Sequence, residues 1–117
     1  METLTGENEV FLTKQKTDGE LANKFEYGET IYCHFKVDPR SREKTVNFQW
    51  INPTGEKEQV YVHLIDKTKK EAYFVVSWLC LDLPMFADLV GSKYLGDWRV
   101  IISLSNKQVA KVEFTVY

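Results

Sequence analysis

The 117 residues fit a single domain, residues 1–117, and their 44% apolar, 27% charged and 14% aromatic content is that of a folded globular protein. Fifteen Lys and Arg against seventeen Asp and Glu give a net charge of −2, so the sequence lacks the basic excess of a typical nucleic-acid-binding module. No apolar run approaches the roughly 18 residues that would span a bilayer. We therefore expect neither a nucleic-acid partner nor insertion into a membrane.

The first ten residues, METLTGENEV, are polar and acidic and do not form a signal peptide. This fits either a cytoplasmic protein or a domain of a longer secreted precursor, and we favour the second, extracytoplasmic interpretation. The two cysteines, Cys33 and Cys80, cannot form a disulfide framework, and there is no CxxC pair for zinc or redox chemistry. We expect both to be free and buried, packing as small hydrophobic side chains.

The dominant period of two, with turn residues at regular intervals, predicts an all-β protein of seven strands. In chain order the expected strands are Glu9–Lys16, Glu29–Val37, Lys44–Ile51, Glu58–Ile65, Glu71–Leu81, Asp97–Leu104 and Gln108–Tyr117. Alternation places an apolar row on one face of the second strand (Ile31, Cys33, Phe35, Val37), the third (Val46, Phe48, Trp50) and the fourth (Val60, Val62, Leu64).

The fifth expected strand differs because its residues are apolar at both parities. Such a strand is normally covered on two sides, so we expect the following loop or a partner subunit to cover it. A homo-oligomer through strand Glu71–Leu81 is the corresponding prediction. After this strand, Asp82 as N-cap, Pro84 in the first turn and Gly91 after the last turn predict a short helix over Met85–Val90.

No recognisable set of residues for catalysis is present: the sequence lacks a phosphate-binding glycine loop, a G-x-S-x-G motif and an H-E-x-x-H motif. His34 and His63 could meet as a metal pair if their strands were adjacent, but no carboxylate or thiol lies at ligand spacing beside them. We favour solvent-facing positions for both. The expectation is therefore a protein that is not an enzyme and has no cofactor and no metal.

The segment Tyr94–Ile102, in which Gly96 and Trp98 precede alternating apolar residues, resembles the sixth-strand entry of immunoglobulin-like β-sandwich modules of bacterial surface and secreted proteins. Trp50 matches their buried third-strand tryptophan. The resemblance implies a seven-stranded, two-sheet sandwich with one short helix before the sixth strand. It departs from antibody domains because Val100 stands where the second bridging cysteine would be.

In such a sandwich the second–third, fourth–fifth and sixth–seventh loops share one end, and each of these loops carries a net charge of +1. The opposite end has a net charge of −5, so we predict a dipolar domain. The basic end is either a solvated rim or a contact for an acidic partner or a stacked copy. The candidate partner-binding residues are Arg40, Arg42, Lys67, Lys69, Lys70 and Lys107.

These features together indicate a non-catalytic protein-binding or spacer module, part of a larger extracytoplasmic protein of bacterial type. The alternative is a carbohydrate-binding module that uses exposed aromatic rings. Its candidate residues are Tyr61, Tyr73, Trp78 and Tyr117.

Overall fold

The computed structural model describes residues 10–15, 21–26, 28–80 and 95–117, and these form eight strands. The strands are β1 (Val10–Thr13), β2 (Lys24–Phe25), β3 (Thr30–Val37), β4 (Thr45–Ile51), β5 (Lys57–Leu64), β6 (Tyr73–Cys80), β7 (Gly96–Leu104) and β8 (Lys107–Val116). The described residues contain no helix, and therefore none with the length and hydrophobicity needed to cross a membrane. The helix expected over Met85–Val90 lies outside the described residues.

The predicted count of seven strands is wrong, because β2 is an additional strand of two residues. It lies where only a polar connection was expected, and two residues are too few to show an alternation. Its position is fixed by tertiary contacts: the backbone N–H of Tyr117 donates to the carbonyl of Phe25 (3.0 Å), and the Phe25 ring is fully buried against Phe114 (5.6 Å between centroids).

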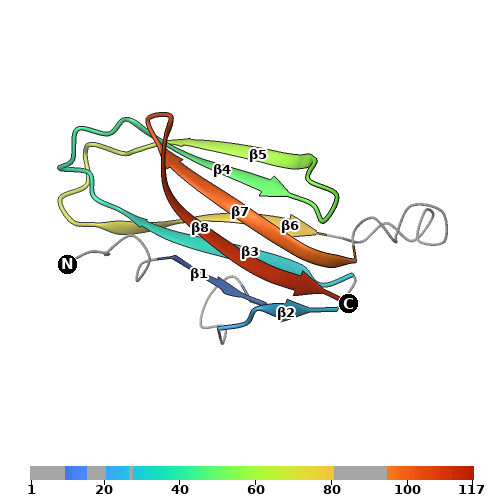
Figure 1. The fold of residues 1–117 in the computed structure, drawn as a ribbon. Helices are drawn as coiled ribbons and strands as arrows, with labels where there is room; N and C mark the ends of the chain where they lie inside the picture. The colour runs from blue at the N-terminus through green and yellow to red at the C-terminus, as the bar shows by residue number, and fades with distance from the viewer. Residues whose placement is uncertain (1–9, 16–20, 27, 81–94) are drawn as a thin grey trace.

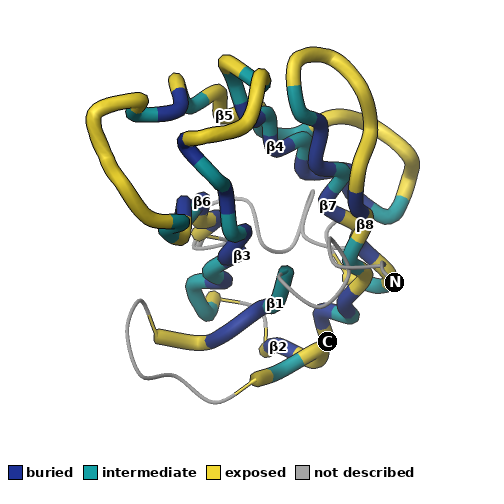
Figure 2. The backbone as a smooth tube through the Cα atoms, turned by 90° about the vertical axis from the view of Figure 1, so that its left-hand side faces the viewer, coloured by how far each residue is buried: buried dark blue, intermediate teal, exposed yellow. Residues whose placement is uncertain are grey.

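The strands form two sheets, which lie as separate layers in Figures 1 and 2. One sheet has the order β1-β3-β6 and the other the order β2-β8-β7-β4-β5. All neighbours are antiparallel except β2, which runs parallel to β8. β6 and β5 are therefore edge strands, and they lie at the same side of the sandwich (Figure 2).

The core lies between the sheets and is built mainly from the inward apolar side chains of β3, β4, β7 and β8, with contributions from β1, β2 and β6. The predicted rows on β3 and β4 are confirmed, with Val46, Phe48 and Trp50 at 0% exposure. Trp98 stacks on Phe114 at 5.8 Å between ring centroids, and Trp50 meets Phe114 edge-on at 6.0 Å. Aromatic pairs in these geometries add to the stabilisation from burial alone.

No disulfide joins the sheets within the described chain, because Cys33 and Cys80 are free. Cys33 on β3 and Val100 on β7, the two positions compared with the antibody disulfide, are fully buried. Burial raises the pKa of the Cys33 thiol far above its usual range, so this cysteine packs as a neutral side chain. A buried polar link between the sheets is instead made by the Trp50 indole N–H, which donates to the Ser77 hydroxyl at 2.9 Å.

The expectation of two buried thiols is wrong for Cys80, which is exposed because it occupies an outward position at the end of an edge strand. The alternation of inward and outward positions also explains the burial of the other side chains of β6. Its Val75, Ser77 and Leu79 are buried, whereas Phe74 and Trp78 point outward and are 45% and 51% exposed. Among the described residues, the second face of this strand is therefore exposed at Phe74 and Trp78, and the loop that was expected to cover it lies outside the described residues.

Candidate functional site

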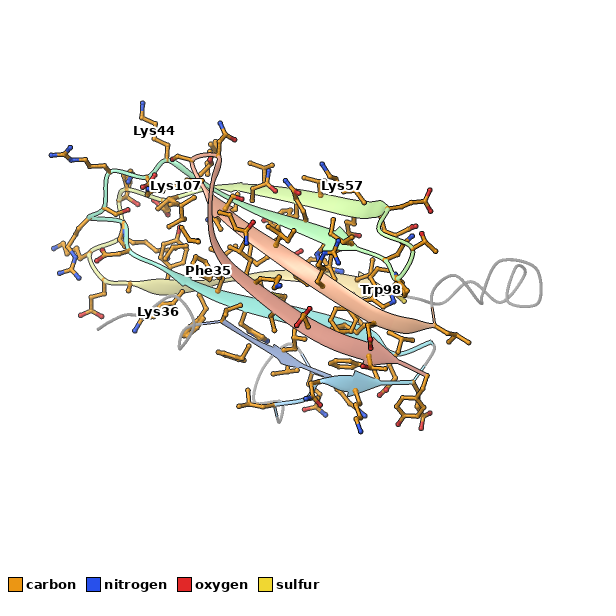
Figure 3. The ribbon with its side chains drawn as sticks, viewed as in Figure 1. Phe35, Lys36, Lys44, Lys57, Trp98 and Lys107 are labelled. Atoms are coloured by element: carbon orange, nitrogen blue, oxygen red, sulfur yellow. The ribbon has the colours of Figure 1, made fainter. Side chains whose placement is uncertain are left out.

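The three basic loops meet at one end of the sandwich, as the sequence predicts. The Lys67 ammonium, from the β5–β6 loop, donates to the carbonyl oxygens of Ser41 (2.7 Å) and Glu43 (2.5 Å) in the β3–β4 loop. The backbone N–H of Lys44 donates to the hydroxyl of Ser105 in the β7–β8 turn (3.1 Å). Figure 3 shows Lys44 and Lys107 at this end. Hydrogen bonds therefore hold the loops together as one rim.

The six candidate partner-binding residues divide into two groups. Arg40 makes two hydrogen bonds to the Asp38 carboxylate (3.0 and 3.2 Å), and this pairing lowers the pKa of Asp38. Lys67 is bonded to loop carbonyls, and the Lys69 ammonium lies 5.4 Å from the centre of the Tyr73 ring. The other three, Arg42, Lys70 and Lys107, are exposed and have no ion-pair partner in the described part of the chain.

A cleft of about 490 Å³ opens beneath this rim, between the ends of the two sheets. Its apolar lining comes from Phe35, Val37, Ile65, Ala72, Leu104 and Val109, and Lys36, Asp38, Arg40 and Ser41 line it with polar groups. The Arg40 and Asp38 charges offset each other at its edge, so Lys36 leaves the lining with a net charge of +1.

The apolar surface of the domain is concentrated elsewhere, along the two edge strands. Of the ten exposed large apolar side chains among the described residues, six lie on β5 and β6. We call this surface the open side: Val60, Tyr61, Val62 and Leu64 on β5, and Phe74 and Trp78 on β6. Sequence reasoning grouped the β5 row on one face but gave no signal that this face is the solvent face.

Side chains rather than backbone hydrogen bonds connect β5 to β6 in the described chain. The Gln59 amide donates to the carbonyl of Trp78 (2.7 Å). The Tyr73 hydroxyl accepts from the Asp66 N–H (2.8 Å) and lies 3.0 Å from Nε2 of His63, to which it can donate. Between these contacts is a groove of about 400 Å³, lined by Gln59, Val60, Tyr61, Val76, Ser77 and Trp78.

Aromatic rings extend the open side over the outer face of β1, β3 and β6. Phe11 stacks on His34 at 4.6 Å and meets Phe74 edge-on at 5.4 Å. His34 is only 7% exposed, so the expectation of a solvent-facing histidine is wrong here. The Thr13 hydroxyl lies 2.9 Å from its Nε2, and burial lowers the pKa of His34.

His34 and His63 lie on different sheets and have different partners. His34 contacts Thr13 and Phe11, whereas His63 contacts Tyr73 and Tyr61. Among the described residues, no three His, Cys, Asp or Glu side chains gather as metal ligands would. Of the four candidate sugar-stacking rings, Tyr61 and Trp78 border the same groove, but Tyr117 lies beside β2 with Leu21 and Lys24. The four therefore do not form one platform.

No protein-family model and no curated protein matches this chain. Its fold, however, matches solved structures. The immunoglobulin-like protein PA1606 of Pseudomonas aeruginosa aligns with a TM-score of 0.57 and 9% identity, over 92% of this chain and 91% of that one. The fold is an immunoglobulin-like β-sandwich. This confirms the predicted fold class, apart from the strand count and the helix that lies outside the described residues.

A second match is to part of a larger protein. The alkylpurine DNA glycosylase AlkC of Pseudomonas fluorescens, solved bound to DNA containing an abasic site analogue, aligns with a TM-score of 0.51 and 14% identity. The alignment covers 92% of this chain but only 30% of the glycosylase. At these identities the likeness shows a shared fold, and this fold serves many unrelated functions.

Proposed function

We propose that this domain is a non-catalytic protein-binding module, and that it contacts its partner through the open side. The observation that carries the proposal is the gathering of six exposed large apolar side chains on two adjacent edge strands. Single exposed apolar residues are normal on a soluble protein, whereas apolar side chains that gather on one side mark an interaction surface. Three of the six, Val60, Tyr61 and Trp78, line one groove. The immunoglobulin-like fold supports a binding or spacer module in general terms.

The contrast with the neighbouring strand favours binding over a purely spacing role. On the same outer face as the β5 row, β4 presents the polar, half-buried side chains of Thr45, Asn47 and Gln49. A spacer would gain nothing from an adjacent row of exposed valines and leucine. This row adds to the cost of keeping the domain soluble unless another protein covers it.

The shape of the open side favours a protein over a sugar. Sugar platforms use flat rings that lie in line, but the Trp78 ring is tilted by 41° from that of Tyr32. The β5 part is mostly aliphatic and offers a pyranose no ring beyond Tyr61. Carbohydrate binding remains the alternative function, and its specific support is the pair Tyr61 and Trp78 beside one groove.

A photo-reactive amino acid placed on the open side in the native host tests the proposal. With the probe at Trp78 or Leu64, we expect discrete protein adducts that are absent with the probe at Val109, which is exposed on β8 outside the open side. Equal adducts at all three positions would contradict the proposal. Quenching of tryptophan fluorescence by a glycan, lost in Trp78→Ala, together with no protein adduct, would establish the sugar alternative.

The basic end has a secondary role in this proposal, as a charged region that steers an acidic partner towards the domain. Arg42, Lys70 and Lys107 are the residues for this role because Arg40 and Lys67 are held by internal bonds. Replacing the three by Gln should slow association and flatten its dependence on salt, with little change in the dissociation rate. An unchanged association rate for the triple variant would remove the basic end from the binding mechanism.

A further inference from the structure

We infer that β5 is the strand through which a second copy of this chain docks, in an antiparallel β5–β5 pair that joins the two larger sheets into one continuous sheet. The inference rests on the proposed function, because it assigns a partner to the β5 half of the open side. Three features of β5 carry it: the direction of its backbone groups, the character of its exposed side chains and the charges at its two ends.

The backbone of β5 presents hydrogen-bonding groups at a free edge. The N–H of Ile65 donates to the carbonyl of Lys44 (2.9 Å), so odd-numbered positions direct their backbone groups towards β4. Because this direction alternates along a strand, the N–H and C=O groups of Val60, Val62 and Leu64 point away from β4. Among the described strands β5 is the last of its sheet, so within this part of the chain these groups face outward.

The same three residues carry the exposed apolar side chains, which are 47%, 52% and 74% exposed. Native edge strands usually avoid pairing with other chains through a charge, a proline or a bulge. The segment 60–65, VYVHLI, has no Asp, Glu, Lys, Arg, Pro or Gly, and the irregularity in β4–β5 pairing lies outside it, at Trp50/Ile51. This edge therefore has none of the usual protections in its central part.

The charges beside β5 favour a second copy as the occupant. Residues 56–58 carry a net charge of −1, and residues 66–71 at the other end of the strand carry +1. In an antiparallel pair each end lies against the opposite end of the other copy, so an end of net charge −1 meets an end of net charge +1 at both. Figure 3 shows Lys57 well separated from Lys44 and Lys107 along the sandwich. The uncharged centre faces its own copy without repulsion, as a two-fold interface requires.

The other edge strand is less suited to this pairing. On β6 the Gln59 amide already occupies the carbonyl of Trp78, which is one of the outward backbone acceptors of that edge. We therefore place the self-association edge on β5, whereas the sequence placed it on Glu71–Leu81. In this arrangement the β6 rings Phe74 and Trp78 border the pair and stay available to another protein.

Sedimentation velocity over a range of concentrations tests the inference on the wild-type chain and two matched variants. Val62→Lys places a charge at the centre of the β5 edge, and Val109→Lys places the same charge on β8, where the valine is 37% exposed. We expect a dimer for the wild type and for Val109→Lys. For Val62→Lys we expect a dissociation constant raised by about tenfold or more. Near-ultraviolet circular dichroism of both variants verifies that each is folded.

A wild type that remains monomeric at the highest concentration would overturn the inference. An equal rise in the dimer dissociation constant for both variants would also overturn it.

Hydrogen exchange gives a second, independent measurement: the amides of Val60, Val62 and Leu64 should become protected as concentration rises, whereas those of β8 should not. A monomer that still forms specific adducts through a probe at Trp78 would sink this inference and leave the proposed function standing. A dimer without such adducts would support the inference and remove the separate protein partner.

Discussion

Strands β4 and β5 are paired neighbours with the same apolar alternation, yet they bury opposite kinds of side chain. The apolar row of β4 is fully buried, with Val46, Phe48 and Trp50 at 0% exposure. The corresponding row of β5 is 47% to 74% exposed. An alternating pattern therefore shows which residues share a face, but not whether that face is covered.

The register between the two strands explains the difference. Val46 lies opposite His63 and Phe48 opposite Tyr61, so it is the less apolar row of β5 that shares the inward face. This row then bonds to β6, through Gln59 to the Trp78 carbonyl and through His63 to the Tyr73 hydroxyl. A shift of one residue would exchange the two rows. The polar contacts of the β5–β6 boundary thus hold an apolar row outward, as is expected where a binding surface overrides ordinary patterning.

The largest expected difference between the core and the open side comes from replacing one tryptophan in each, Trp50 on β4 and Trp78 on β6. Trp50→Ala removes a fully buried ring and leaves the Ser77 hydroxyl without its indole donor. It should lower the free energy of unfolding by about 3–5 kcal/mol. Trp78→Ala, at a ring that is 51% exposed, should cost about 1 kcal/mol or less. Urea denaturation of both variants measures the difference, and equal losses would show that the open side is part of the folding core.

Much of this fold is predictable from sequence because short-range alternation and turns encode it. All seven expected strands are present, and the β7–β8 hairpin turns at Ser105 and Asn106, which both adopt positive φ. The shared basic end also follows from the connectivity of the fold. In contrast, β2 is specified by contacts with β8 that are distant in sequence, and a two-residue segment has no periodicity to recognise.

The candidate site was predictable only in part, because exposure depends on register and on strand order. The apolar character of β6 at both parities did indicate an unusual surface, and Phe74 and Trp78 are part of the open side. The β5 row was missed, since nothing local distinguishes it from the buried row of β4. The basic residues were found by charge alone, but sequence could not show that Arg40 and Lys67 are used within the loops.

A matched pair of valines sharpens the comparison between β4 and β5 with a smaller change. Val46→Ala removes two methyl groups from the core and should cost about 2 kcal/mol, from lost burial and the cavity that remains. Val62→Ala removes the same groups from the solvent face and should change the stability of the monomer by about 0.5 kcal/mol or less. Both are measured at a concentration low enough to exclude the dimer. A loss at Val62 as large as that at Val46 would mean that this face is already covered within one chain.

His34 gives the subtlest test, because it occupies an outward-facing position of β3 and is nevertheless buried, unlike the outward row of β5. Burial lowers its pKa in the folded state below the ordinary value of 6.5. As pH falls through about 6.5, the unfolded chain binds a proton that the folded chain does not, so stability is retained above this pH and declines below it. The melting temperature of the wild type should therefore drop between about pH 7.5 and about pH 5.5. In His34→Gln, where residue 34 cannot titrate, the slope of melting temperature against pH should be shallower, whatever the absolute stability of the variant.

The lowered pKa of Asp38 does not interfere, since its effect begins only near its ordinary value of 3.8. Identical slopes for the wild type and His34→Gln would show that water reaches this ring, and that the outer faces of β3 and β5 are equally open.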